Sequence, residues 1–170
     1  TFDKTHFAIN DNAGGIDKDV AKMYAFKLGK PKGHKPEKHS IGQFGIGMKR
    51  AFFKIGEHIL VDSVSQKSDF KLTISVPDWR DKEDDKDWDF EFDSVNVSKN
   101  SLKNTYTNIR ITQLKEDVKR QFTDPQFLND LETELSLEHL FAINKGLKIT
   151  INNNHALKAP NITLLNSKDY

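Results

Sequence analysis

Three glycines with G-x-x-G-x-G spacing, directly ahead of an amphipathic segment, constrain this chain more than any other feature. From Gln43 to Ile55 the apolar residues recur at i, i+4, i+7, i+8 and i+11, which predicts a helix with one buried face. Glycines at a helix start let an anion approach the free backbone N–H groups, where the helix dipole favours negative charge. The glycines could instead serve only close helix–sheet packing. The run reads Ile41-Gly42-Gln43-Phe44-Gly45-Ile46-Gly47-Met48-Lys49.

The glycine order distinguishes this run from two common phosphate-binding motifs. It reverses the dinucleotide fingerprint G-x-G-x-x-G, which disfavours a Rossmann fold. The Gly- and Lys-containing stretch 29–35 does not match the P-loop pattern G-x-x-x-x-G-K-[ST] either.

A second candidate site follows the first predicted strand, Thr5 to Asn10. The next five residues, Asp11-Asn12-Ala13-Gly14-Gly15, have the composition of a tight turn. A carboxylate at a strand end that faces a pocket could accept a hydrogen bond from an exocyclic amine of a ligand and so discriminate between ligands. The alternative is a plain Asp/Asn/Gly turn.

Composition excludes several classes of protein. The 170 residues fit a single domain with a real core, and no apolar run is long enough to span a membrane. The absence of Cys excludes disulfide scaffolds, thiolate metal sites and cysteine nucleophiles, and we expect a cytoplasmic protein. The net charge of +1 conceals a basic stretch, 27–54, with eight Lys or Arg against one acid. This stretch would attract a polyphosphate.

The remaining pattern predicts strands and helices in alternation. Residues 28–41 contain glycines and prolines and are expected to form a long loop or lid. The acidic stretch 78–93 is interpreted as a solvated loop followed by the outer face of a strand, and His34 and His39 lack a third metal ligand. We expect an α+β fold, in which sheet and helices pack as a sandwich. Helices are predicted at 17–27, 43–55 and 125–144, strands at 59–64, 70–76, 88–92 and around 109–111, and a hairpin turn at 152–154.

In their order along the chain, these pieces resemble the GHKL ATPases, the superfamily of DNA gyrase, the ninety-kilodalton heat-shock chaperone, histidine kinases and MutL. The stretch Ile41 to Phe52 is most similar to the chaperone and MORC versions, and the resemblance covers roughly residues 5–115. It implies a two-layer α/β sandwich, the Bergerat fold, with a mixed, mostly antiparallel sheet and helices on one face. It also implies one ATP-binding domain over 1–170, with a lid at about 28–41.

The resemblance also implies roles for individual residues. Asp11 would accept from the adenine amino group, Gly15 would lie beside the base, and Thr107 would bond the water of the adenine site. The glycine run would hold the triphosphate, and Lys49 lies where its ammonium would help a phosphate. The implied ATP-binding set is Asp11, Gly15, Gly42, Gln43, Phe44, Gly45, Ile46, Gly47, Lys49 and Thr107.

The sequence departs from the family pattern at three points. Ala13 replaces the first turn glycine, and Tyr106 replaces the glycine before Thr107. The family's first motif, a helix with a general-base Glu and an Asn that holds Mg²⁺, is expected upstream of Thr1, and we expect no metal ligand within 1–170. Chemistry needs that base beside the attacking water, and Mg²⁺ to bridge the phosphates.

The resemblance therefore implies ATP and Mg²⁺ as cofactors. We expect slow hydrolysis to ADP in the full-length protein, coupled to lid closure and conformational change or dimerisation. A client protein or DNA is a conceivable partner, and a membrane is not. Two alternatives remain open, a histidine-kinase catalytic domain and a non-catalytic module whose basic loop binds nucleic acid or an acidic protein.

Overall fold

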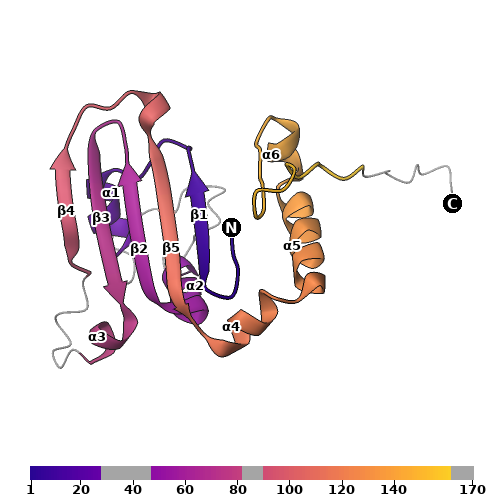
Figure 1. Ribbon diagram of the computed structural model, residues 1–170. Coiled ribbons are helices and arrows are strands. Elements are labelled where there is room, and N and C mark those ends of the chain that lie inside the picture. Colours follow the sequence, from indigo (N-terminus) through magenta and orange to yellow (C-terminus); the bar gives the residue numbers. More distant parts are fainter. Residues whose placement is uncertain (28–46, 82–89, 162–170) are drawn as a thin grey trace, which may run out of the picture.

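The fold is built on a five-stranded sheet in the computed structural model, which describes residues 1–27, 47–81 and 90–161 (Figure 1). The strand order is β1-β5-β2-β3-β4, and each of these neighbouring pairs is antiparallel. The expected mixed sheet is thus antiparallel throughout the described part of the chain. The strands are β1 (His6–Asp11), β2 (Gly56–Val64), β3 (Ser68–Ser75), β4 (Phe92–Val97) and β5 (Tyr106–Leu114).

One face of the sheet carries the main core. Residues on β2, β3 and β5 alternate between buried and more exposed positions, because successive side chains of a strand point to opposite faces. The buried face packs against α1 (Lys18–Val20), the π-helix η1 (Ala21–Ala25) and α2 (Gly47–Ile55). This arrangement confirms the predicted two-layer α/β sandwich. The core includes Phe26, Phe52, Ile59, Val61, Phe70, Leu72 and Ile111.

The chain after β5 forms a second, smaller cluster beside β1. It contains α4 (Glu116–Gln121), α5 (Pro125–Glu138) and α6 (Leu140–Asn144). Phe2 is 7% exposed and packs against Phe122 and Phe127, with ring centroids 4.7 and 5.7 Å away. These contacts hold the C-terminal helices against the edge of the sheet (Figure 1).

The predicted helix 125–144 is two helices, because the backbone leaves the helical conformation at His139, where φ is −104° and ψ is 15°. The predicted hairpin at 152–154 is confirmed as a short turn closed by a bridge between Thr150 and Ala156. Asn152 and Asn153 adopt positive φ there, which Asn tolerates better than most residues.

The acidic stretch differs most from the sequence prediction. The short helix α3 (Val76–Arg80) occupies what we expected to be a loop, because Ser75 caps it and Pro77 lies in its first turn. The predicted strand 88–92 is displaced, since β4 begins only at Phe92. Phe90 instead packs beside Trp79 and Phe53, at centroid distances of 5.9 and 6.5 Å.

The remaining short element is the 3-10 turn η2 (Leu102–Asn104) before β5. Among the described residues, no helix combines the length and the apolar character needed to cross a membrane.

Candidate functional site

Two of the predicted site residues are neighbours in the sheet. Asp11 ends β1 and pairs with Thr107 on β5, and Thr107 pairs in turn with Ser63 on β2. Directly paired residues of antiparallel strands share a face of the sheet, so these three lie in one row on the helix-covered face. Thr107 and Ser63 are 5% and 0% exposed, whereas Asp11 is exposed at the end of the row. The row therefore leads from a buried hydroxyl pair to an accessible carboxylate.

A hydrogen-bond network fixes the buried end of this row. The Ser63 hydroxyl oxygen accepts from the Ile16 backbone N–H at 2.8 Å. It also lies 3.1 Å from the Tyr106 carbonyl oxygen and 3.1 Å from Thr107 Oγ1. Because Ile16 follows the Asp/Gly turn, Ser63 links that turn directly to β5.

The turn after Asp11 needs glycine at one position. Gly15 has φ +69°, and a Cβ there would run into the Val64 carbonyl and lie 2.9 Å from the Ser65 nitrogen. The turn is therefore pressed against the end of β2, where a side chain does not fit. Asp11 Oδ1 accepts from the Ala13 N–H at 2.9 Å, which holds the carboxylate beside the turn. Gly14 also has positive φ, +108°, but faces open space.

The second predicted motif is only partly described. Gly42, Gln43, Phe44, Gly45 and Ile46, like the predicted lid 28–41, lie outside the described residues. Gly47 is exposed at the first position of α2, and no atom of the described residues lies within 4 Å of where its Cβ would be. Its phosphate role remains a prediction.

Lys49 makes contacts that its sequence position did not suggest. The residue is 3% exposed, and its Nζ donates to the backbone carbonyls of Ala25 and Lys27, at 3.1 and 2.6 Å. Burial lowers the pKa of this ammonium below its usual value. Lys49 thus ties α2 to the end of η1 and to Lys27 just beyond it, and its predicted phosphate contact remains a prediction.

Sequence reasoning missed Ser63. The signal was present, because Ser63 continues the period-two face of Ile59 and Val61, which places its hydroxyl on the apolar side of the sheet. Its significance depends on the pairing with Thr107, which lies 44 residues away in the chain.

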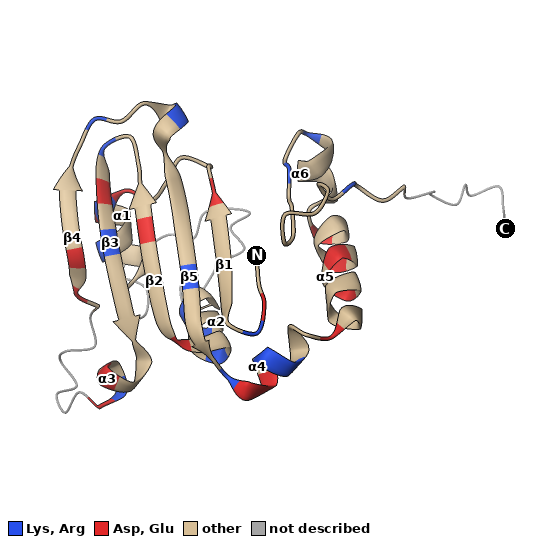
Figure 2. Cartoon of the chain, viewed as in Figure 1, with Lys and Arg blue, Asp and Glu red and all other residues tan. Residues whose placement is uncertain are grey.

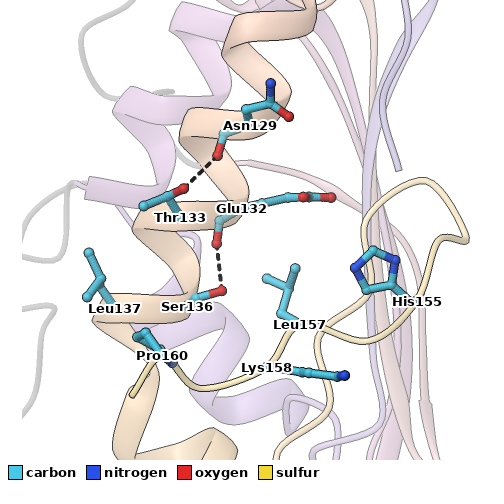
Figure 3. A pocket seen from close by; sticks show the side chains of 9 residues that line it. All are labelled: Asn129, Glu132, Thr133, Ser136, Leu137, His155, Leu157, Lys158 and Pro160. Carbon is cyan, nitrogen blue, oxygen red and sulfur yellow. Dashed lines mark hydrogen bonds between the residues drawn. The ribbon is translucent and has the colours of Figure 1, made fainter. Parts of the chain in front are cut away.

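A groove of about 500 Å³ lies elsewhere, between α5 and residues 155–160, and shares no residue with the row (Figure 3). Thr133 and Ser136 on its α5 side donate their hydroxyl protons to backbone carbonyls of their own helix, at 2.9 and 2.7 Å. Its lining mixes a carboxylate, an ammonium and an imidazole, from Glu132, Lys158 and His155.

The row suits the polar edge of a base that carries an amine. Asp11 and Thr107 offer oxygen atoms on one face of the sheet. At Gly15 the turn lies so close to β2 that there is no room for a Cβ. For a divalent cation, the described residues contain no group of three His, Asp or Glu side chains that could hold one.

The fold and this row define a two-layer sandwich with a candidate nucleotide site on its helix-covered face. A family profile described as "Histidine kinase-, DNA gyrase B-, and HSP90-like ATPase" matches residues 2–105, more than half of the chain. The chain belongs to this family, and the predicted GHKL membership is confirmed. The predicted closeness to the chaperone and MORC branches remains a prediction.

The chain is also similar to a solved structure, the topoisomerase IV ATP-binding domain of Francisella tularensis in complex with a small-molecule inhibitor. The sequence identity is 15% and the TM-score is 0.41. The similarity covers 80% of this chain and 35% of that one, so the chain spans about a third of that structure's length. No curated protein matches the chain.

Proposed function

We propose that this chain is an ATP-binding domain that recognises adenine through Asp11 and Thr107. The observation that carries the proposal is their direct pairing across β1 and β5, behind a turn that admits only glycine at Gly15. Membership in a family of ATPases supports the same ligand. Asp11 is exposed, so its carboxylate is accessible to a ligand.

Each described residue has a defined task in this proposal. Asp11 uses Oδ1 to hold the Ala13 N–H and offers Oδ2 to the adenine amino group. Gly15 keeps the turn against β2, so that the base can lie beside the backbone. Thr107 contributes a hydroxyl oxygen from the buried end of the row, directly or through a water molecule.

The phosphate half of the proposal rests on the resemblance. Backbone N–H groups of residues 42–47 would hold the triphosphate, because free N–H groups at a helix start bind anions. Mg²⁺, bound together with ATP, would neutralise the negative charge of the phosphates.

We further propose slow hydrolysis of ATP to ADP in the full-length, cytoplasmic protein. Its use would be conformational, because the predicted lid, residues 28–41, would close over the nucleotide and so couple the nucleotide state to conformational change or dimerisation. A client protein or DNA would then respond to the closed state. These steps are proposed from the behaviour of the family.

Calorimetric titration of the intact protein with ATP, ADP and GTP, with and without Mg²⁺, tests adenine binding. We expect saturable binding selective for adenine nucleotides, lost in Asp11→Asn because the amide places a donor where the amine needs an acceptor. Asp19→Asn is the matched control, since Asp19 lies on α1 and pairs with Lys18 at 2.9 Å. Absence of ATP binding by the intact wild-type protein would refute the proposal.

A further inference from the structure

The buried Ser63 hydroxyl has more partners than it has protons. Its oxygen contacts an N–H, a carbonyl oxygen and the hydroxyl of Thr107, all within 3.1 Å. A serine hydroxyl carries one proton and two lone pairs, and a carbonyl can only accept. Only one arrangement of the protons makes all three contacts hydrogen bonds. Ser63 receives the Ile16 N–H, gives its proton to the Tyr106 carbonyl, and accepts the proton of Thr107.

This arrangement determines what Thr107 can offer to a ligand. Because Thr107 donates its single hydroxyl proton to Ser63, its oxygen can only accept further hydrogen bonds. Asp11, its neighbour in the row, is a carboxylate and accepts only. Both polar groups of the row then require a donor from the ligand side.

We propose that Ser63 is a specificity-determining positioning residue, which orients the Thr107 hydroxyl so that the site selects a base with a 6-amino group over one with a 6-oxo group. The inference rests on the proposed adenine site and names the source of its selectivity. A 6-oxo base would place lone pairs opposite lone pairs, whereas a 6-amino base supplies the missing protons. Thr107, the buried acceptor of the two, would be left unpaired in this way, which disfavours the wrong ligand.

The test compares the affinities of ATP and inosine triphosphate, which differ at position 6 of the base. We expect the wild-type protein to prefer ATP and Ser63→Ala to reduce this preference by roughly five- to tenfold, the equivalent of one hydrogen bond. Without Ser63, the Thr107 hydroxyl is free to rotate and donate to a 6-oxo group. The affinity for inosine triphosphate should therefore rise relative to the affinity for ATP.

Ser68→Ala is the matched control. Ser68 is 0% exposed in the same sheet, accepts the Lys18 N–H at 2.9 Å and lies 3.2 Å from the Ser65 hydroxyl. The two serines therefore have comparable burial and bonding, but only Ser63 contacts Thr107. Ser68→Ala should lower stability to a similar extent and leave the ATP preference unchanged.

Two further variants keep the test valid if Ser63→Ala folds poorly. Ser63→Thr and Ser63→Val have nearly the same shape and differ by the hydroxyl, so the preference should persist in the first and fall in the second. A double-mutant cycle with Thr107→Val separates orientation from a general structural effect. Once Thr107 lacks its hydroxyl, Ser63→Ala should change the ATP preference no further.

The outcomes distinguish this inference from the proposed function. A wild-type protein that binds neither nucleotide refutes the adenine site itself. A wild-type protein that binds ATP without preferring it to inosine triphosphate refutes the role of Ser63 and leaves ATP binding intact. An ATP preference that persists in both Ser63→Ala and Ser63→Val also refutes the role of Ser63 and leaves ATP binding intact.

Discussion

Gly15 is the residue at which backbone geometry decides most directly what the chain tolerates. Its φ of +69° is strained for any other residue, and a Cβ there would meet the backbone of Val64 and Ser65, which cannot move without disturbing β2. Gly14 shares the positive φ but faces open space. The two glycines therefore separate the cost of backbone strain from the cost of a steric clash.

We predict that Gly15→Ala is the more damaging of the two substitutions. Gly14→Ala should cost roughly 1–3 kcal/mol of unfolding free energy for the left-handed backbone. Gly15→Ala should cost about 1–3 kcal/mol more, because it adds overpacking against β2. Urea unfolding of both variants provides the measurement. Equal losses would show that the turn moves away from β2 without penalty.

Asp3 provides a pH-dependent prediction at the same scale. Its Oδ1 accepts the Thr5 hydroxyl proton at 2.6 Å, the Thr5 N–H at 2.7 Å and the His6 N–H at 3.0 Å. Led by the Thr5 side-chain hydrogen bond, these lower the pKa of Asp3 from 3.8 to about 2. Since the folded pKa lies below the unfolded one, the stabilisation is complete above pH 3.8 and disappears as the pH falls through about 2.

An NMR titration of the Asp3 carboxyl carbon should therefore show a midpoint near pH 2. In Thr5→Val, which removes the strongest of these donors, the midpoint should move up toward the ordinary value. A wild-type midpoint close to 3.8 would mean that this turn does not persist in solution.

The residue scale also shows how far a sequence can single out candidate residues. Asp11 and Gly15 belong to a continuous motif, so local turn chemistry was enough to single them out. Thr107 required the family resemblance, and the structure places it next to Asp11. Ser63 escaped because its role arises from strand register, and sequence spacing carries little information about register between distant strands.

At the scale of elements, Lys49 connects the two helical parts of the sandwich. A buried ammonium is costly to desolvate, and here its Nζ hydrogen bonds are to two carbonyls, of Ala25 and Lys27. Ala25 is the last residue of the π-helix η1 and Lys27 lies just beyond it, so Lys49 caps carbonyls at the end of this helix.

We predict that Lys49→Met lowers the free energy of unfolding by about 1–3 kcal/mol, because two carbonyls lose a charged donor while the apolar stem is retained. Lys54→Met is the matched control, since Lys54 is exposed on the same helix, and should change stability by less than about 0.5 kcal/mol. Thermal and urea unfolding measure both variants. Equal stability of the two would mean that the Lys49 hydrogen bonds contribute nothing net.

The helices and strands with the clearest periodicity in the sequence were predicted most accurately. The strands β2, β3 and β5 alternate clearly, and the structure confirms them near the expected residues. The alternation at 88–92 was misleading, because Phe90 packs beside Trp79 and does not extend the sheet. The break at His139 was missed, since the leucine stripe continues across it and carries no Gly or Pro.

At the scale of the whole molecule, charge and packing divide the chain differently. α5 carries four acids and no Lys or Arg, which makes it an acidic helix in a nearly neutral molecule (Figure 2). Packing, in contrast, joins the C-terminal helices to the sheet through aromatic rings. Phe7 and Phe122 each pack against both core clusters, with their centroids 6.0 Å apart.

This shared aromatic contact predicts how the molecule unfolds. Phe122→Ala should lower the free energy of unfolding by about 3 kcal/mol, because it opens a cavity between the two clusters. It should also separate two transitions, since Phe122 joins Phe127 on α5 to Phe7 on β1, while the central sheet retains its own core. Phe141→Ala is the matched control, because Phe141 is 79% exposed on α6 and should be nearly neutral.

Urea unfolding, followed in parallel by far-UV circular dichroism and by tryptophan fluorescence, measures this separation. Trp79 lies on α3 beside the main core, so in a Trp88→Phe background the fluorescence follows the sheet, whereas the helical signal includes α5 and α6. The two probes should coincide in the wild type and in Phe141→Ala, and diverge in Phe122→Ala. Coincident transitions in Phe122→Ala would contradict the division, because they would mean that the two clusters unfold as one unit without the shared ring.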